Sequence, residues 1–343
     1  MKLVWSPQHV RHAPRAFLSR GRLTVSPERP ERVERLMEGA RSVGVEPMEA
    51  RRFGRSPVLA VHERRYLAFL ETAHVRWREL GDAGPEVVAN MHPQRYPGRC
   101  PAQIVGEAGW YMADGACPIG EGTFEAALAA ADTALTAASL LLGGVREVYA
   151  LCRPPGHHAF ADMAGGFCYL NNTAIAAAHL AERMGRVAIL DIDVHHGNGT
   201  QAIFYERGEV LTLSIHADPA AYYPFFWGHA GERGRAAGAG ANRNWPLPVG
   251  SGDEPWLAAI GEALAMLSES DCTALVVALG LDVHEGDPLQ GMRVSRAGLH
   301  AAGRLIGGRP LPVLLVQEGG YPQPELGANL AAFLEGFLSA RPR

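Results

Sequence analysis

The sequence predicts a single α/β domain in which helices cover both faces of a central parallel sheet. From residue 122 onward, short and continuously apolar segments alternate with segments of helical periodicity, a pattern typical of buried parallel strands joined by helices. The chain has 343 residues, of which 47% are hydrophobic, so it can bury one large core. No stretch has the composition of a linker, and we therefore expect residues 1–343 to form one domain.

The first third of the chain is its less regular part. Residues 2–5 predict a short strand, residues 6–32 a loop rich in Arg, Pro and His, and residues 31–43 a helix. A second helix is expected from about residue 61 toward Leu80. Residues 81–105 are rich in proline and predict a long inserted loop. A loop of this length in a globular domain is usually functional or part of an interface.

The rest of the chain alternates regularly between the two kinds of element. The expected helices have an apolar face at helical spacing, and the expected strands are short apolar runs rich in Val, Ile and Leu. The helices are expected at residues 123–142, 171–184, 255–267, 295–306 and 324–338. The strands are expected at residues 145–151, 187–192, 210–216, 274–280 and 313–317.

Composition and charge argue against several classes of function. The formal net charge is −4 and the pI is about 6.4, so a nucleic-acid polyanion is not an expected partner. The five cysteines are odd in number and form no Cys-x-x-Cys pair, which fits reduced thiols in the cytoplasm. The N-terminal residues lack the apolar core of a signal peptide, and no apolar run is expected to span a membrane.

Ionisable side chains follow four of the predicted strands, at the point where each strand ends. The carboxyl ends of parallel strands meet at one edge of a sheet, and ligands of such sheets bind at that edge. We therefore expect one shared site there. The four segments that reach it are Arg153-Pro-Pro-Gly-His-His158, Asp193-Val-His195, Asp282-Val-His284 and Glu318-Gly-Gly-Tyr321.

Two carboxylates and an imidazole cluster around the end of the predicted strand 187–192. Side chains alternate along a strand, so Asp191, Asp193 and His195 are expected on one face, where burial requires a partner that offsets their desolvation. A divalent metal ion is such a partner, because Asp oxygens and His nitrogens both ligate zinc. With Asp282 as a third ligand, one position would stay open for water, as in catalytic zinc sites. A hydrogen-bonded polar strand end is the alternative.

The tandem histidines and the terminal tyrosine supply the remaining chemistry. His157 and His158 lie on a turn rich in Gly and Pro, which presents imidazoles to a site rather than burying them. One of them can act as a general base and then as a general acid. Tyr321 follows two glycines, which let backbone and substrate approach closely. Its hydroxyl could donate to the oxyanion of a tetrahedral intermediate, so the pattern predicts a metal-assisted hydrolase.

These residues also carry a family resemblance that runs in order through nearly the whole chain. The chain resembles the histone deacetylase superfamily in the segments Arg153-Pro-Pro-Gly-His-His158, Gly165-Gly-Phe-Cys-Tyr-Leu-Asn-Asn172, Asp191-Ile-Asp-Val-His-His-Gly-Asn-Gly-Thr200, Gly280-Leu-Asp282 and Glu318-Gly-Gly-Tyr321. Within the superfamily, the insertion at 81–105 and the segment Pro118-Ile-Gly-Glu-Gly-Thr123 look like the bacterial acetylpolyamine amidohydrolases.

The resemblance implies the fold and the ions. The fold would be the arginase–deacetylase α/β fold. One zinc ion would be held by Asp193, His195 and Asp282, and the oxygen-rich ligand set would also accept Fe²⁺ or Co²⁺. A structural potassium ion near Asp191, Asp193, His195 and Ser214 is usual in this superfamily.

The resemblance also implies the catalytic roles. His158 would be the general base and acid, and His157 beside it would be an electrostatic partner hydrogen-bonded to Asp191. Tyr321 would polarise the amide carbonyl. Some members have Asp where this chain has Asn198, which would give His158 a neutral partner, as in the polyamine branch.

Substrate and assembly are implied in the same way. Gly166, Phe167 and Tyr223 would line a narrow channel for an extended acyl-lysine-like or acyl-polyamine chain. Polyamine relatives use a similar insertion to form a homodimer, which we expect here too. The substrate would be a small acetylated amine.

The rim of the channel departs from the polyamine pattern. Acidic side chains of those enzymes help to receive the cationic amine, at positions that are Val105 and Ala116 in this chain. Glu107 and Asp114 are nearby but offset, and either could serve as a rim acid.

Three alternatives stay open from the sequence. A generalist deacylase would act on acetyl-lysine or other small amides. A ureohydrolase of the same fold would need ligands for two manganese ions, but His195 is followed by His196-Gly197, which offers no second carboxylate. A non-catalytic binder of acylated ligands would be expected to lack Tyr321 or one of the tandem histidines, and all three are present.

Overall fold

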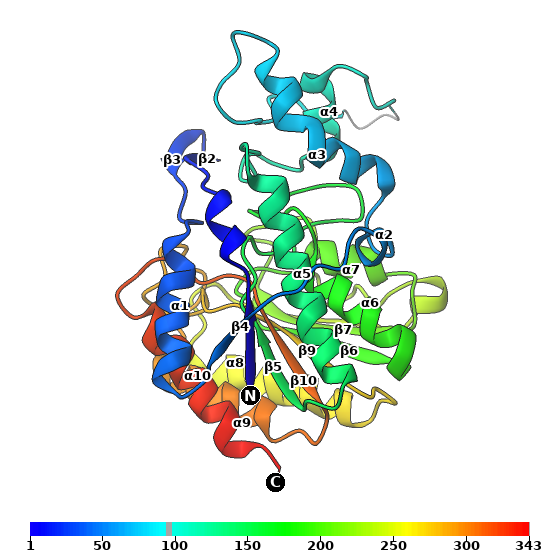
Figure 1. The fold of residues 1–343 in the computed structure, drawn as a ribbon. Coiled ribbons are helices and arrows are strands. Elements are labelled where there is room, and N and C mark those ends of the chain that lie inside the picture. The colour runs from blue at the N-terminus through cyan, green and yellow to red at the C-terminus, as the bar shows by residue number, and fades with distance from the viewer. Residues whose placement is uncertain (94–97, 343) are drawn as a thin grey trace.

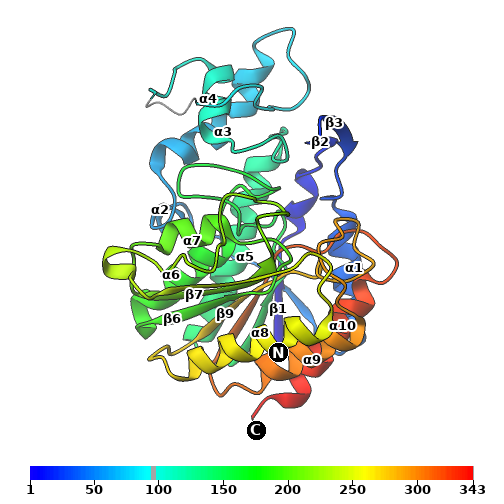
Figure 2. The same ribbon diagram turned by 180° about the vertical axis from the view of Figure 1, so that it is seen from behind.

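The computed structural model describes residues 1–93 and 98–342, and residues 94–97 and 343 lie outside that part. It confirms the predicted α/β domain with a central parallel sheet, which has eight strands in the order β4-β1-β5-β10-β9-β6-β7-β8 (Figures 1 and 2). The strands are β1 (Lys2–Trp5), β4 (Pro47–Glu49), β5 (Glu147–Ala150), β6 (Val187–Asp191), β7 (Val210–Ala217), β8 (Asn242–Leu247), β9 (Leu275–Leu279) and β10 (Val313–Gln317).

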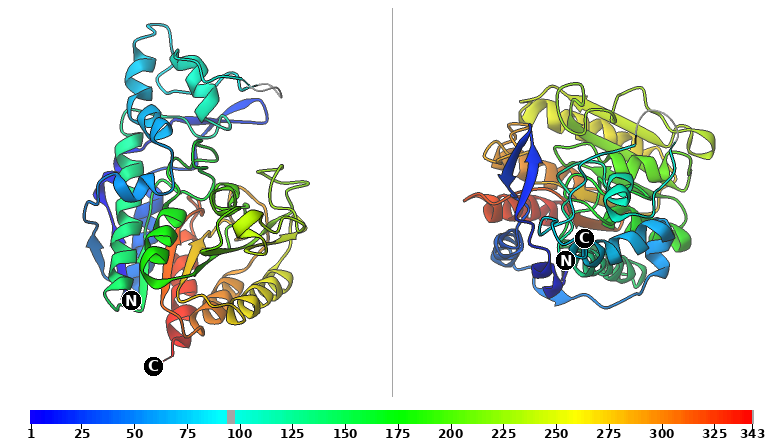
Figure 3. Two further views of the ribbon diagram at one scale, coloured as in Figure 1. Left: turned by 90° about the vertical axis from the view of Figure 1, so that its right-hand side faces the viewer. Right: turned by 90° about the horizontal axis from the view of Figure 1, so that it is seen from above.

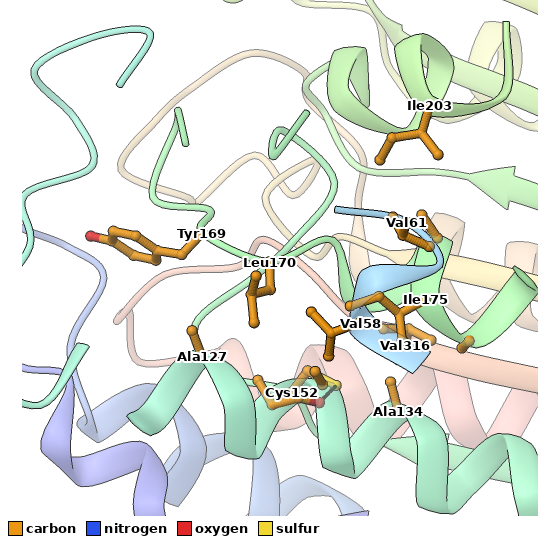
Figure 4. Packing of buried hydrophobic residues seen from close by; sticks show 14 of the residues in the cluster. Val58, Val61, Ala127, Ala134, Cys152, Tyr169, Leu170, Ile175, Ile203 and Val316 are labelled. Atoms are coloured by element: carbon orange, nitrogen blue, oxygen red, sulfur yellow. Dashed lines mark hydrogen bonds between the residues drawn. The ribbon is translucent and has the colours of Figure 1, made fainter. Parts of the chain in front are cut away.

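Helices cover both faces because the strand residues alternate between two apolar cores. On β5, Val148 and Ala150 belong to one core and Tyr149 to the other. The first core packs α5 (Thr123–Leu142) and α6 (Asn172–Met184) against the sheet, and Figure 4 shows Ala134 of α5 and Ile175 of α6 within it. The second core packs α1 (Glu31–Ser42), α8 (Asp253–Ser268), α9 (Arg296–Gly307) and α10 (Leu326–Ala340).

A smaller group of elements stands at the end of the molecule opposite the two termini (Figure 3). It contains α3 (Arg64–Arg78), α4 (Ile104–Tyr111) and a hairpin of β2 (Ala16–Ser19) and β3 (Arg22–Val25). The predicted insertion at 81–105 connects α3 to α4. Between α3 and α4, the described residues form no helix or strand, and Val87 pairs with Ile119 in an isolated bridge.

Several short elements differ from the expectation. The segment 6–32, predicted as a loop, contains the 3₁₀ helix η1 (Pro7–Arg11) and the β2–β3 hairpin. The hairpin forms because Arg20 and Gly21 both adopt the left-handed backbone that a two-residue turn requires, with φ of 49° and 75°. The strands β4 and β8, and the short helices α2 (Ser56–Leu59) and α7 (Asn198–Phe204), were also not expected, because they are too short or too polar to show a clear period.

Helix α5 corrects the expectation that no apolar run could span a membrane. By length and composition alone, its 20 residues are long and apolar enough to do so. In the fold, 61% of its 18-residue apolar window is buried. Most of its alanines belong to the core that packs α5 and α6 against the sheet, and this packing accounts for the apolar composition of the helix.

Candidate active site

The four polar segments that the sequence assigns to one edge of the sheet meet there. β5, β10, β9 and β6 are direct neighbours in that order, although other elements separate them in the chain. Their carboxyl ends therefore bring the tandem histidines, the Asp and His residues after β6, the Asp after β9 and the tyrosine after β10 together. All of these side chains are buried: His157, His158, Asp193, His195, Asp282 and Tyr321. The expectation that the turn would present the tandem histidines rather than bury them is therefore wrong as to burial, because both rings pack against the hydrogen-bond partners Asp191 and Asn198, although His158 still lines the cavity.

Asp193, His195 and Asp282 form one cluster of potential metal ligands. One donor atom of each lies within 4.8 Å of the other two. His195 Nδ1 is 3.1 Å from Asp193 Oδ1 and 3.2 Å from Asp282 Oδ2. Burial alone would lower the pKa of His195, but the nearby carboxylates of Asp193 and Asp282 outweigh burial and raise the pKa to about 9. The cluster therefore attracts positive charge.

Two observations show that this cluster fits a metal ion. Asp282 Oδ2 is buried and has no hydrogen-bond partner among the described residues, which is unfavourable unless a cation completes its environment. Two glycines leave room around the carboxylates. A Cβ on Gly280 would lie 2.3 Å from Asp193 Oδ2, and one on Gly319 would lie 2.1 Å from Asp282 Oδ2. The oxygen and nitrogen donors suit zinc, and Fe²⁺ or Co²⁺ as well.

A second group of potential ligands fits a metal less well. His157, Cys168 and Glu318 also place donor atoms within 4.8 Å of one another. However, Glu318 already accepts hydrogen bonds from the backbone N–H groups of Gly156 and His157 and from Thr173 Oγ1. Burial raises the pKa of the Cys168 thiol well above its usual range, which opposes the thiolate that a metal requires. We assign this group to the support of the histidine turn.

His157 is held by the expected acidic partner. Its Nδ1 lies 2.9 Å from Asp191 Oδ2. Gly197 passes so close that a Cβ there would lie 2.3 Å from the same oxygen. Burial alone would lower the pKa of His157, but the charges of Asp193 and Asp191 outweigh it and raise the pKa to about 10. The two carboxylates therefore favour the protonated form of His157.

His158 has the opposite protonation preference. Its Nδ1 lies 2.7 Å from Asn198 Oδ1. An amide oxygen only accepts, so Nδ1 carries the proton and Nε2 is left as the basic nitrogen. Burial, followed by the charges of His157 and His195, lowers the pKa of His158 well below its usual value. A neutral imidazole with a free Nε2 suits a general base.

Tyr321 is fixed from both sides. Its backbone N–H donates to Asp287 Oδ2 at 2.9 Å, and the guanidinium of Arg32 lies 4.8 Å from the centre of its ring. The Phe167 ring centre is 5.6 Å from that of Tyr321. Burial raises the pKa of Tyr321 well above its usual value, so the hydroxyl keeps its proton and can donate.

A buried charge cluster near the site was missed in the sequence. Glu28 is fully buried and lies 2.8 Å from Arg32 Nη1, 2.9 Å from Arg153 Nη2 and 3.3 Å from His12 Nε2. Burial alone would raise the pKa of Glu28, but the charge of Arg153 and the other cations outweigh it and lower the pKa below its usual range. Arg32 also donates to the carbonyl of Gly320 at 2.7 Å. The cluster thus connects the N-terminal segment to the turn that carries the tyrosine.

The site opens into one cavity of about 540 Å³, and His195 is the potential ligand that lines it. His158, His195 and Tyr321 lie among its lining residues, and so do the expected channel residues Gly166, Phe167 and Tyr223. The structure therefore brings together the residues that the sequence assigned to the channel and to the chemistry. The expected potassium ligands Asp191 and Ser214 are also neighbours, as a register pair between β6 and β7.

The two potential rim acids lie in different environments. Glu107 is not among the described residues that line the cavity, and its carboxylate is paired with Arg76 at 2.5 Å. Asp114 does line the cavity, but its Oδ2 accepts a hydrogen bond of 2.6 Å from Tyr223 Oη. Neither side chain is a free carboxylate at the mouth of the channel.

Two groups of cavity residues were not found from the sequence. The first is the β2–β3 hairpin, whose Phe17, Leu18 and Arg20 line the cavity. The sequence pattern that could have predicted the hairpin is a short apolar run on either side of Arg20-Gly21. The second is the exposed aromatic run Phe225-Phe-Trp227 at the mouth.

The fold and the site define a hydrolase with the arginase–deacetylase fold. The chain belongs to the histone deacetylase family, because the family model for the histone deacetylase domain matches residues 26–337. It is accordingly an enzyme that hydrolyses linear amides.

Its relatives resemble it along the whole chain. It is 44% identical over 345 residues to the acetylpolyamine amidohydrolase of Burkholderia pseudomallei, covering 99% of this chain and 100% of that protein. It is 39% identical over 338 residues to the acetylpolyamine amidohydrolase of Mycoplana ramosa, covering 98% and 99%. The crystal structure of the acetylpolyamine aminohydrolase from Burkholderia pseudomallei matches with a TM-score of 0.97 at 43% identity over 100% of both chains.

Proposed function

We propose that this protein is a metal-dependent deacetylase that hydrolyses the acetyl amide of small acetylated amines, with acetylpolyamines as the first candidates. The observation that carries the proposal is the shared cavity. Of the buried cluster of Asp193, His195 and Asp282, His195 lines the same cavity as His158 and Tyr321. The names of the relatives support the polyamine class.

Asp193, His195 and Asp282 would hold the metal ion, zinc in the first instance. A bound zinc ion supplies Lewis acidity, which polarises the amide carbonyl and lowers the pKa of water. The orphaned oxygen of Asp282 and the space left by the two glycines support one such ion at this position.

The protein's own residues perform the proton transfers. His158 Nε2 takes a proton from the attacking water and later gives it to the leaving amine. His157, charged and hydrogen-bonded to Asp191, stabilises the negative charge that develops beside it. The Tyr321 hydroxyl donates to the oxyanion at the acetyl carbon. Phe167 and Tyr223 orient the alkyl chain and exclude water from its length.

A specific observation favours a second candidate, a generalist deacylase. Among the described residues that line the cavity, Asp114 is the one acidic side chain, and it is engaged by Tyr223. The exposed aromatic run Phe225-Phe-Trp227 borders the mouth instead. Such a rim accepts neutral chains as readily as cationic ones.

One experiment separates the candidates. The value of kcat/KM is compared for N-acetylputrescine, an acetyl-lysine peptide and an uncharged acetamide of equal length, at low and high salt. A preference for the cationic amine that weakens with salt supports the polyamine class, and an exposed rim charge would give it only about 0.2–1 kcal/mol. Indifference to charge, or faster peptide cleavage, supports the generalist. Two bound manganese ions with urea release would indicate a ureohydrolase, and binding without turnover would indicate a non-catalytic relative.

Two further features complete the proposal. A structural potassium ion would lie near Asp191 and Ser214, and removal of K⁺ should then lower thermal stability. The protein would form a homodimer through the insertion at 81–105 and its surroundings, which carry the exposed apolar side chains of Leu23, Val25 and Met91. Light scattering on a deletion of residues 88–100 tests this, because an unchanged oligomer would contradict it.

A further inference from the structure

Asp114 occupies a position from which it reaches two different parts of the channel wall. It follows α4 in a segment tied to the loop after β5, because the N–H of Ala113 donates to the carbonyl of Ala164 at 2.7 Å. The Asp114 carboxylate accepts hydrogen bonds from three donors. These are Tyr223 Oη at 2.6 Å, the backbone N–H of Ala116 at 2.8 Å and the backbone N–H of Gly166 at 3.2 Å.

The two wall residues held by Asp114 come from separate loops and both pack against the proton-transfer histidine. Gly166 follows β5, and a Cβ at this position would lie 2.4 Å from His158 Cδ2. Tyr223 follows β7, and its ring meets the His158 ring edge-on with centres 5.0 Å apart. Phe167, next to Gly166, adopts a left-handed backbone with φ of 70°, and it lines the cavity.

We propose that Asp114 is a positioning residue that ties the Gly166–Phe167 wall to the Tyr223 wall and thereby sets the width of the channel. The inference rests on the proposed deacetylase function. It adds to that function a structural reason for a preference for unbranched alkyl chains. The negative charge of Asp114 stabilises the channel wall and does not bind a substrate ammonium.

The hydrogen-bond geometry supports this role. An O–H···O⁻ bond of 2.6 Å is in the range of charge-assisted bonds, which are about twice as strong as neutral ones. Burial, followed by the charge of Asp114, raises the pKa of Tyr223 well above its usual value, so the phenol stays a donor. A carboxylate with three donors in place gains little by turning toward solvent or substrate.

The test compares Tyr223→Phe with Asp114→Ala and Asp114→Asn. Tyr223→Phe removes one hydroxyl and leaves the carboxylate in place, so it separates the wall role from a charge role. Each variant is assayed for kcat and KM with a linear N-acetyl alkylamine, an N-acetyl diamine of equal length, and an N-acetyl amine whose alkyl chain is branched. Circular dichroism and thermal melting check the fold.

If Asp114 ties the walls, Tyr223→Phe and Asp114→Ala should lower the linear-over-branched preference by a similar factor. That factor is about tenfold, within what one charged hydrogen bond supplies. The double variant should lose no more than either single one, because both remove the same link. Asp114→Asn, which keeps an acceptor oxygen, should retain more of the preference than Asp114→Ala. The diamine and the neutral alkylamine should be affected equally.

Two results would overturn the inference. One is a selective loss of the diamine in Asp114→Asn with unchanged selectivity in Tyr223→Phe, which would make Asp114 an ammonium receptor. The other is an unchanged linear-over-branched preference in all variants. If the wild-type protein hydrolyses no acetyl amide, the proposed function fails separately. Calorimetric binding of linear and branched amides to the wild type and to Asp114→Ala then decides whether Asp114 sets the width.

Discussion

Replacing Glu28 by Gln tests the buried charge cluster behind the tyrosine turn. The side chain keeps its size, but Arg32 and Arg153 lose their counter-charge within a fully buried site. Removing one partner of a buried ion pair costs about 3–5 kcal/mol, because the remaining charge stays desolvated. For a chain of 343 residues, with an unfolding entropy of ~2.1 cal/mol/K per residue, this corresponds to a loss of roughly 4–7 °C in Tm.

The measurement is urea and thermal unfolding of wild type and Glu28→Gln at pH 7. Glu206→Gln, which breaks an exposed pair with Arg235, is the matched control and should change stability by less than about 0.5 kcal/mol. Because the folded-state pKa of Glu28 lies below its ordinary value, its stabilisation is fully present above about pH 4.5 and is lost as pH falls through the lowered pKa. The difference between the two proteins should therefore persist across pH 5–8. Indistinguishable unfolding of Glu28→Gln and wild type at pH 7 would refute the reasoning.

Three further outcomes are expected at the site. Tyr321→Phe should fold normally and lose about 10²–10³ in turnover, and His158→Ala about 10²–10⁴, in an acetyl-amide assay with circular dichroism as the fold control; near-wild-type rates would remove the assigned roles. Chelation should abolish turnover, and one equivalent of Zn²⁺, Co²⁺ or Fe²⁺ per chain should restore it; full activity after chelation, or two tightly bound transition metals, would contradict a single site. Gly166→Ala should impair turnover because its Cβ would displace the His158 ring; unchanged kcat would show that the ring tolerates it.

Much of the fold could be predicted because its signals are local. The buried strands β5, β6, β9 and β10 are apolar runs bounded by polar segments, and their carboxyl ends had to meet once they were placed in a parallel sheet. The potential metal ligands and the tandem histidines come directly after these strands in the sequence. Placing the strands in the sheet therefore also placed these side chains.

The rest depends on contacts between distant segments, which leave no local pattern. Strand β8 lies at the sheet edge and contains Asn244 and Pro246, so it lacks the apolar run of a central strand. The hydrogen bond between Asp114 and Tyr223 joins positions 109 apart. The bonds of Glu28 to Arg153 likewise join residues 125 apart. These partners are recognised only when the loops are already placed.

The strand order has a consequence for how the chain folds during synthesis. The two strands at the centre of the active edge, β10 and β9, come from the last quarter of the chain and insert between β5 and β6, which are made earlier. A nascent chain that has emerged only as far as β8 therefore exposes unpaired, apolar edges on both β5 and β6. Those edges have no native partner until translation is nearly complete, so the growing polypeptide is open to aggregation through them in the interval.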